Sequence, residues 1–413
     1  MAVGGIVSVA IGSSSHTPEL DGIRGVACLS VLLAHCLIGI IDLPPDSRFT
    51  SLKDASSPFL LGGVDLFFVL SGFLIGGILL DNRNAGNFFR AFWTRRIARI
   101  FPVAYLLLAT YAVALLVSSR FDFPQLKMWL LADPQPPFWT YATFMQSIPI
   151  ALDGYGGPRW VGITWSLAIE EQFYMLFPFA VYFLSRRSLT AAAIAGIVMA
   201  LLCRMVTEVN VNAYASYVLL PCRIDGLLFG VLVAVIVRNP RALVIARQLR
   251  FLLDLAVLAI VLVIMSNVLV NYAAELRASE PYLSTLVRNL YFSALALMFA
   301  ILILRIFLYE DDIYKRILRS EVLVKAGLIS YATYMYHQAV NGLLHGFIFN
   351  QAPKVSSIGE AVIGIIVMVS ALSLATLSFI FLERPIRRIG QRVRYQPAQP
   401  SVQSLPQPMR VAV

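Results

Sequence analysis

An apolar run over residues 59–80 contains the segment GVDLFFVLSGFLI at residues 63–75, in which Asp65 is the single charged side chain. A helix of about 20 apolar residues is long enough to cross the hydrocarbon core of a bilayer. The helix satisfies its own backbone polar groups, whereas a buried charge is costly in lipid. The run therefore predicts a membrane-spanning helix, and Asp65 becomes a candidate functional residue.

Nine further apolar runs of similar length are present. They are residues 23–41, 100–118, 161–184, 188–206, 215–237, 251–270, 289–308, 326–349 and 358–382. The stretch 128–150 is also apolar, but an aspartate and three prolines interrupt it at Asp133, Pro134, Pro136 and Pro137. We expect this stretch to be an interfacial or re-entrant piece of a long loop. The sequence thus predicts an all-α integral membrane protein, a bundle of about ten transmembrane helices.

The composition supports a membrane location. The 413 residues are 59% hydrophobic and 14% charged, with a mean hydropathy of +0.76. Soluble domains carry about 25% charged residues, so most of this chain is expected to lie in lipid. The 33 basic residues exceed the 23 acidic ones. Such an excess is usual in the cytoplasmic loops of membrane proteins, and we therefore expect membrane lipids but no nucleic acid as a partner.

The distribution of Lys and Arg predicts the orientation. With ten spans, alternate loops share a side, and one side then carries 22 basic residues against 10 on the other. Basic residues concentrate in cytoplasmic loops, which predicts that both termini are cytoplasmic. We expect residues 1–18 to be an N-terminal cytoplasmic segment without a signal peptide and residues 19–390 to be the membrane domain. The Pro- and Gln-rich residues 391–413 predict a disordered cytoplasmic tail.

Several ionisable residues lie inside the predicted spans, where such residues mark function. Arg24 and His35 are eleven positions apart, so they share a helix face and differ by roughly 16 Å in height. Other charged or polar groups reach a depth similar to that of His35. They are Asp65, Glu170, Glu171, the Arg223 and Asp225 pair, and His337. This shared layer predicts a polar cavity inside the bundle, and structural ion pairs are the alternative.

Three arginines, Arg95, Arg96 and Arg99, open the span at residues 100–118. Arg96 and Arg99 share a helix face because they are three residues apart. Each arginine alone is explained by topology, since basic residues anchor spans on the cytoplasmic side. As a cluster they can hold a phosphorylated ligand through bidentate hydrogen bonds.

The four cysteines, Cys28, Cys36, Cys203 and Cys222, have a spacing that fits no zinc or redox motif. We predict no metal site. Cys203 and Cys222 fall near the same end of neighbouring spans, so either a disulfide or two buried free thiols is consistent with the sequence.

Several segments, taken together in their order, resemble the acyltransferase 3 family. They are ELDGIRG at residues 19–25 followed by His35, GVDLFFVLSGFLI at 63–75, RRIARIFP at 95–102, TWSLAIEEQFY at 164–174, SYATYMYH at 330–337, and more weakly RIDG at 223–226 and ERP at 383–385. The resemblance covers residues 17–390. The family's basic residue followed by His corresponds to Arg24 and His35, and its paired arginines correspond to Arg96 and Arg99.

The resemblance implies transfer of an acyl group, usually acetyl, from cytoplasmic acyl-CoA to an exported carbohydrate. Acceptors in the family include exopolysaccharide, O-antigen and lipochito-oligosaccharide, and some members modify macrolides instead. It also implies a multi-pass protein of the bacterial inner membrane. The expected partners are acetyl-CoA as donor and a free or lipid-linked carbohydrate as acceptor. A transporter or flippase of a lipid-linked sugar is the main alternative.

We assign roles as a hypothesis. Arg95, Arg96 and Arg99 would bind the phosphates of CoA, and the pantetheine arm would pass Arg24. His35 would act as general base, or less simply as nucleophile. An acidic residue would orient its imidazole, as in a catalytic triad. The candidates for that residue are Asp65, Glu170 and Glu171. His337 is a rival base or an acceptor contact, and the remaining predicted acceptor contacts are Ser71, Tyr174, Arg223 and Asp225.

Overall fold

The computed structural model describes residues 17–44, 47–121, 124–131, 134–272 and 281–397. Residues 1–16 of the predicted N-terminal segment and residues 398–413 of the predicted tail lie outside this description. Within the described residues the chain is helical, and β-pairing is limited to the isolated bridges Ile41–Val355 and Ala85–Pro397. The predicted all-α fold is therefore confirmed.

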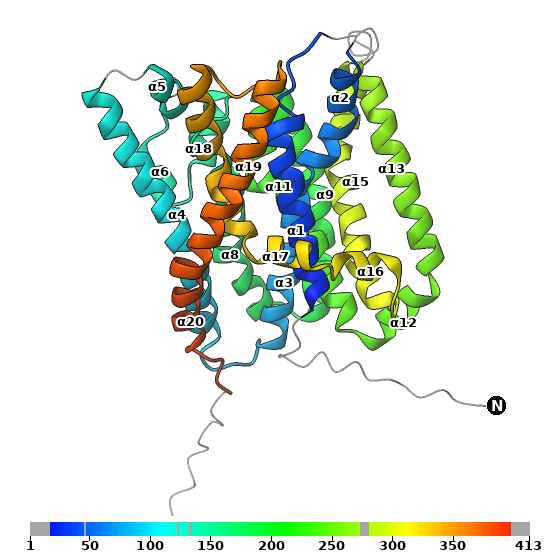
Figure 1. The fold of residues 1–413 in the computed structure, drawn as a ribbon. Helices are drawn as coiled ribbons and strands as arrows, with labels where there is room; N and C mark the ends of the chain where they lie inside the picture. The colour runs from blue at the N-terminus through cyan, green and yellow to red at the C-terminus, as the bar shows by residue number, and fades with distance from the viewer. Residues whose placement is uncertain (1–16, 45–46, 122–123, 132–133, 273–280, 398–413) are drawn as a thin grey trace, which may run out of the picture.

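The helices follow one another with short connections (Figure 1). They are α1 (Pro18–Leu33), the π-helical turn η1 (Ala34–Ile38), α2 (Arg48–Leu61), α3 (Gly63–Asp81), α4 (Phe88–Arg120), α5 (Pro124–Leu130), α6 (Phe138–Ala142), α7 (Ser147–Asp153), the 3₁₀ turn η2 (Gly162–Thr164), α8 (Trp165–Phe183), α9 (Arg186–Asn210), α10 (Ala213–Val218), α11 (Leu220–Val237), α12 (Pro240–Gln248), α13 (Arg250–Tyr272), α15 (Pro281–Leu308), α16 (Ile313–Leu318), α17 (Glu321–Leu328), α18 (Ser330–Phe349), α19 (Ile358–Ser378), the π-helical turn η3 (Phe379–Glu383) and α20 (Arg384–Gln391).

Seven helical segments of the described chain are long and apolar enough to cross a membrane. They are Pro18–Ile38, Arg48–Asp81, Phe88–Arg120, Arg186–Asn210, Ala213–Val237, Thr285–Leu308 and Ile358–Gln391. The protein is thus a multi-pass membrane protein. Each of the ten predicted runs contains a helix, but α8, α13 and α18 are not among the seven. The site residues predicted on α8 and α18 are polar, and they lower the mean hydropathy of those helices. The number of about ten membrane spans therefore stays a prediction, while seven candidate spans are shown.

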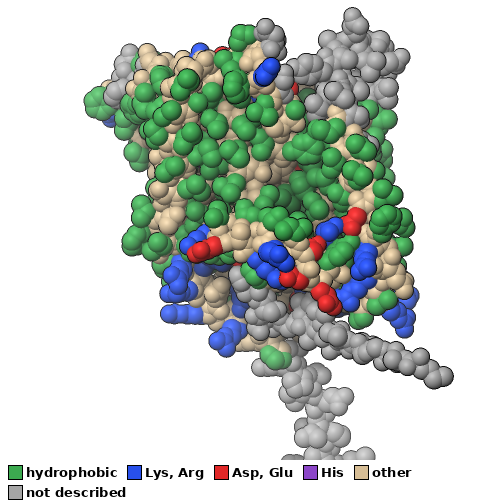
Figure 2. Space-filling view, turned by 45° about the vertical axis from the view of Figure 1, so that its right-hand side comes forward, with side chains coloured by type: hydrophobic (Ala, Val, Ile, Leu, Met, Phe, Trp, Pro, Cys, Tyr) green, Lys and Arg blue, Asp and Glu red, His purple; other side chains and the backbone are tan. Residues whose placement is uncertain are grey.

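A broad hydrophobic belt covers the face of the bundle shown in Figure 2, and charged side chains gather below it. Among the exposed large hydrophobic residues of the helices are Val198, Leu262 and Val369, each more than half exposed. In water such a surface would be unfavourable, but hydrocarbon solvates it at no cost. The charged end is the end at which α12, α16 and α20 lie (Figure 1), which carries many of the basic residues assigned to the cytoplasm.

Helix α1 lies in the middle of the bundle, with α4, α19 and α20 on one side and α13 and α15 on the other (Figure 1). Behind it, α3 packs closely on α11. A Cβ atom on Gly72 would lie 1.9 Å from the Leu227 carbonyl oxygen, and one on Gly230 would lie 2.0 Å from that of Val69. Small residues allow backbones to approach in membranes, where packing rather than the hydrophobic effect holds helices together.

The interrupted stretch at residues 128–150 forms no long helix. In its described residues, α5 ends, α6 lies whole and α7 begins, and each of these helices has five to seven residues. Trp129 donates its indole N–H to the carbonyl of Gln338 on α18 at 3.1 Å, and the Arg159 guanidinium lies over its ring. The stretch is therefore a loop folded against the bundle, as the prolines predicted.

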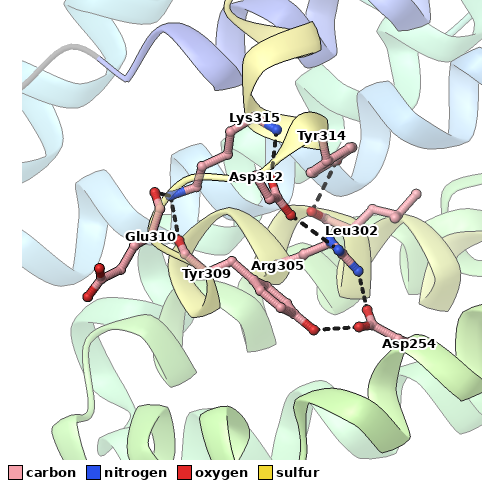
Figure 3. A network of polar contacts seen from close by, with 8 residues as sticks. All are labelled: Asp254, Leu302, Arg305, Tyr309, Glu310, Asp312, Tyr314 and Lys315. Carbon is pink, nitrogen blue, oxygen red and sulfur yellow. Dashed lines mark hydrogen bonds and ion pairs between the residues drawn. The ribbon is translucent and has the colours of Figure 1, made fainter.

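A polar network joins α13, α15 and α16 at the charged end (Figure 3). Arg305 forms ion pairs with Asp254 on α13 and with Asp312 before α16, the latter at 3.2 Å. Asp312 also caps α16 by accepting from the Lys315 backbone N–H at 2.9 Å. Lys315 donates to the carbonyls of Tyr309 and Glu310 at 2.6 and 2.9 Å. The network orients the turn between α15 and α16.

The cysteines are free thiols, including Cys203 and Cys222, for which the sequence left a disulfide open. The Cys222 thiol contacts the Thr207 hydroxyl at 3.6 Å. Residues 391–397, which belong to the predicted tail, are placed against α4. Asn87 donates to the Arg394 carbonyl at 2.8 Å and accepts from the Gln396 backbone N–H at 2.9 Å.

Candidate active site

A cavity of about 90 Å³ lies between α1, α3, α4, α8 and α18. Six of the residues predicted for the site line it, namely Arg24, Ser71, Arg96, Arg99, Glu170 and Tyr174. Ser166 and Tyr334 line it as well. Side chains of five helices therefore meet around one polar space, but of the residues placed at a shared depth only Glu170 lines it.

One end of this cavity carries three guanidinium groups. Arg24 comes from α1, and Arg96 and Arg99 come from successive turns of α4. Arg24 forms an ion pair with Asp21 at 2.6 Å. Arg96 lies over the rings of Phe92 and Tyr174, at 5.8 and 5.5 Å from the ring centroids. Among the described residues no carboxylate forms an ion pair with Arg96 or Arg99, so this end of the cavity has an excess of positive charge.

Arg95 does not line the cavity, although it was predicted with Arg96 and Arg99. Its Nε atom donates to the Val393 carbonyl at 2.8 Å, and its guanidinium lies 5.0 Å from the centroid of the Tyr395 ring. Burial raises the pKa of the Tyr395 phenol, which therefore stays neutral under the cation. Because neighbouring helical residues point about 100° apart, Arg95 faces the C-terminal segment while Arg96 faces the cavity.

The acidic residue of the cavity is Glu170 on α8. It accepts hydrogen bonds from the Ser71 hydroxyl at 2.6 Å and from the Tyr174 hydroxyl at 3.2 Å. Its neighbour Glu171 is 7% exposed, does not line the cavity, and has an oxygen without a hydrogen-bond partner in the described part of the chain. Glu170 thus links α8 to α3 across the cavity, and the two glutamates have different surroundings.

The two predicted histidines contact each other. The Nδ1 atom of His35 lies 2.9 Å from the Nε2 atom of His337, and the ring planes differ by 7°. The Nδ1 atom of His337 lies 2.6 Å from the Tyr334 carbonyl oxygen. His337 is 1% exposed, whereas His35 is partly exposed.

The predicted carboxylate partner of His35 is not found among the described residues. Glu170 bonds Ser71 and Tyr174, and Asp65 forms an ion pair with Arg223 at 2.7 Å. The hydrogen-bond partner of the His35 ring is instead the second histidine. A triad of His35 with an acidic residue was therefore a wrong expectation.

A local distortion of α1 positions His35. The residue lies in the π-helical turn η1, which closes with a bond of 2.9 Å from the Gly39 N–H to the Ala34 carbonyl. Asn341 on α18 donates to the carbonyl of His35 at 2.9 Å. Single π-helical turns inside α-helices occur frequently at functional sites. Here the turn and Asn341 together hold the His35 backbone against α18.

Tyr334 connects the cavity to the histidine pair. Its side chain lines the cavity, its hydroxyl lies 2.6 Å from the Ser166 hydroxyl, and its ring centroid lies 5.7 Å from that of His337. Its carbonyl is the group bonded by His337. His35 itself is not part of the cavity lining. One residue, Tyr334, therefore lies between the basic cavity and the two imidazoles.

The ion pairs of the remaining predicted residues differ from expectation. Arg223 and Asp225 do not pair with each other and do not line the cavity. Arg223 bonds Asp65, and Asp225 accepts from Arg204 at 2.9 Å and from Ser293 at 2.6 Å. These bonds join α3, α9, α11 and α15, as in the structural alternative considered from the sequence.

The sequence reasoning missed several polar residues. Arg204 is fully buried, although the sequence analysis did not single it out. Its position inside the apolar run 188–206 was the available signal. Ser166 and Tyr334 stand within segments already singled out, at 164–174 and 330–337, but nothing in their spacing marked them. Asn341 lies four residues after His337, which places it on the same face of α18.

Comparison with known proteins gives a family and several relatives. The model of the acyltransferase 3 family, described as an acyltransferase domain, matches residues 17–379. YrhL of Bacillus subtilis is 33% identical over 192 residues, 45% of this chain and 27% of that protein. The peptidoglycan O-acetyltransferase OatA of Listeria monocytogenes is 32% identical over 170 residues, 40% of this chain and 24% of that protein.

A third relative matches over most of this chain. The O-acetyltransferase OatA of Staphylococcus aureus is 25% identical over 393 residues, 92% of this chain and 58% of that protein. The chain thus spans between about a quarter and 58% of the length of these relatives. No solved structure matches it.

Proposed function

This chain belongs to the acyltransferase 3 family, and on that premise we propose that it is a membrane O-acyltransferase. The reaction moves an acyl group, in the simplest case acetyl, from cytoplasmic acyl-CoA to a hydroxyl group of an exported carbohydrate. The observation that carries the proposal is the cavity with Arg24, Arg96 and Arg99 at one end and Tyr334, joined to the histidine pair, in its lining.

The basic end of the cavity is suited to the phosphates of CoA. Arg96 and Arg99 form no ion pair within the described chain, and a guanidinium offers several N–H donors in the fork that matches phosphate oxygens. CoA carries these phosphates at one end and the reactive thioester at the other. With the phosphates at α4, the pantetheine arm would enter the cavity along α1, past Arg24 and toward the level of His35.

The chemistry follows from a basic imidazole beside a thioester. His35 removes the proton from the acceptor hydroxyl as its oxygen attacks the thioester carbonyl carbon. The C–S bond then breaks, and the proton on His35 passes to the departing thiolate, so that ester and CoA thiol are the products. Ser71, Glu170 and Tyr174, which are bonded to one another in the cavity, would contact the acceptor or the acyl group.

The acceptor is assigned as a carbohydrate of the cell surface. The three relatives are named as O-acetyltransferases, two of them for peptidoglycan. We place the protein in the bacterial inner membrane with about ten spans and both termini in the cytoplasm. This arrangement would bring the basic end of the cavity to the cytoplasmic acyl-CoA pool, while the sugar, free or lipid-linked, arrives from the other side.

The test is release of the CoA thiol from acetyl-CoA by purified protein, with and without a crude surface-polysaccharide extract. We expect release that the extract stimulates and that His35→Ala abolishes while the variant still inserts and elutes as folded protein. His345→Gln is the matched control, because His345 is a buried histidine on α18 away from the cavity lining. A folded wild-type protein that cleaves no thioester with any donor or acceptor would favour a flippase.

A further inference from the structure

We infer that His337 is a positioning residue that holds His35 in the tautomer protonated at Nδ1, so that Nε2 of His35 is the basic atom. The inference rests on the proposed acyl transfer for its chemical meaning, but its structural content is independent. It is carried by a chain of contacts that runs from the Tyr334 carbonyl to His337 and on to His35.

The donor and acceptor of each hydrogen bond in this chain of contacts follow from the Tyr334 carbonyl, at which the chain begins. The Tyr334 carbonyl oxygen can only accept, so the Nδ1 atom of His337 at 2.6 Å must carry a proton. In a neutral imidazole the other nitrogen is then an acceptor. The Nε2 atom of His337 therefore presents a lone pair to Nδ1 of His35 at 2.9 Å, and Nδ1 of His35 must be the donor.

The ring geometry supports a hydrogen bond between the two imidazoles. The ring centroids are 5.1 Å apart, the nitrogens are 2.9 Å apart, and the planes differ by 7°. If the two rings were stacked face to face, the distance between their centroids would be similar to the shortest distance between their atoms. Here the nitrogens are much closer than the centroids, so the rings meet edge to edge in nearly parallel planes. An N–H in one ring plane then points at the in-plane lone pair of the other ring.

The surroundings fix the neutral form of His337. It is 1% exposed, and no carboxylate bonds either ring within the described residues. A doubly protonated His337 would be a buried cation with no carboxylate beside it in the described part of the chain, and burial of an unpaired charge is costly. The main chain on both sides is also held, since His337 bonds a carbonyl of its own helix and Asn341 bonds the carbonyl of His35.

In this arrangement His337 takes the role that a carboxylate has in a catalytic triad, but His337 is uncharged. In a triad the third group keeps the imidazole in one tautomer and one orientation. Here a backbone carbonyl orients His337, and His337 orients His35. When Nε2 of His35 takes the hydroxyl proton, its Nδ1–H still donates to His337, and the proton later leaves from Nε2 to the thiolate. The opposite tautomer would have no free lone pair at Nε2.

The first measurement is the tautomer itself. The full chain is labelled with nitrogen-15 histidine in lipid nanodiscs near neutral pH, and because it contains only four histidines, loss of signals in His35→Ala assigns those of His35. We expect Nδ1 of His35 to carry the proton and Nε2 to be unprotonated. A wild-type His35 protonated at Nε2 overturns the inference.

The second measurement is kinetic and uses a conservative variant. In His337→Gln an amide oxygen can still accept near the position of Nε2, whereas His337→Leu offers no acceptor. We expect His337→Leu to lose about 10²-fold or more of kcat while its KM for acetyl-CoA changes by less than about threefold. His337→Gln should retain kcat within about tenfold. His345→Gln, which removes a buried histidine of the same helix, should leave kcat unchanged.

The outcomes separate this inference from the proposed function. If the wild-type protein releases no CoA, the acyl transfer fails, while the nitrogen-15 spectrum still reports the tautomer. If the protein is active and His337→Leu retains wild-type kcat, the positioning role is wrong and the acyl transfer stands. If His337→Leu does not fold, the wild-type tautomer and the kcat of His337→Gln test the positioning role instead. A loss of kcat of about 10²-fold or more in His337→Gln would then contradict that role.

Discussion

At the scale of single residues, the direction in which a side chain points from its helix decides which charged groups form ion pairs. Arg223 and Asp225 are two residues apart on one helix, and residues at that spacing do not face each other. Arg223 instead bonds Asp65 on α3, and Asp225 bonds Arg204 on α9. Glu170 and Glu171 differ in the same way, since only the first lines the cavity. Each buried charged side chain therefore pairs with a residue on whichever neighbouring helix its own helix face contacts.

The same reasoning separates the arginines of α4 and leads to a prediction. Arg96 and Arg99 line the cavity, so Arg96→Ala and Arg99→Ala should each raise the KM for acetyl-CoA by about 10- to 100-fold, the loss expected for one or two charge-assisted hydrogen bonds. The measurement is thiol release at varied donor concentration.

The matched control for these variants is Arg90→Ala. Arg90 belongs to α4 and is exposed, and it does not line the cavity. Its removal costs the same formal charge and should leave the KM for acetyl-CoA unchanged. Equal KM values for the variants of all three arginines and the wild type would return Arg96 and Arg99 to a role in topology alone.

At the scale of helices, close approach of α3 and α11 sets the wall of the cavity. Ser71 and Gly72 are neighbours on α3: one lines the cavity and the other presses on the backbone of α11. The C-terminal residues 393–396 hold α4 in a similar way through Arg95 and Asn87. These site residues are thus each held in place by an adjacent residue of the same helix, which contacts a different part of the protein. Gly72 does this for Ser71, and Arg95 does it for Arg96.

The approach of α3 and α11 can be tested with two glycines. Gly72→Ala puts a Cβ at 1.9 Å from the Leu227 carbonyl oxygen, so the helices must separate, and we expect a loss of about 1–3 kcal/mol in the free energy of unfolding or failure to fold. Gly76→Ala is the control, because its Cβ would meet Val231 at an ordinary 3.4 Å. Unfolding midpoints in detergent compare the two, and equal midpoints would contradict the packing described.

At the scale of the whole molecule, the charged end and the basic end of the cavity belong to the same side. The charged band lies at the end of the bundle where α12, α16 and α20 are found (Figures 1 and 2). Lys and Arg concentrate on the cytoplasmic side of membrane proteins. The orientation predicted from the basic residues would therefore bring Arg96 and Arg99 to the cytoplasm, where the proposed acyl-CoA donor is found.

This orientation predicts the behaviour of reporter fusions. Green fluorescent protein fused after Val413 should fluoresce, because the C-terminus is expected in the cytoplasm. Alkaline phosphatase joined between α18 and α19, at residues 351–357, should be active on the opposite side. The reverse pattern at both junctions would invert the orientation, and it would place the arginine cavity away from the donor.

The amino-acid sequence by itself determined the helices and gave a predicted depth for their polar residues. Long apolar runs must be helical in lipid because each backbone group needs a partner inside its own segment. Depth follows from position along a helix at a fixed rise per residue. The all-α fold, the family and the choice of Arg24, Ser71, Arg96, Arg99, Glu170 and Tyr174 as site residues were therefore within reach of the sequence.

Only the tertiary structure decided which of these groups touch. The partner of His35 is His337 rather than a carboxylate, Arg95 faces the C-terminal segment, and Arg204 is buried beside Asp225. Partners at equal depth differ in the rotation of each helix about its axis and in which helices are neighbours. Packing of the whole bundle sets both, through contacts as local as Gly72 against Leu227, and no spacing along a single helix encodes them.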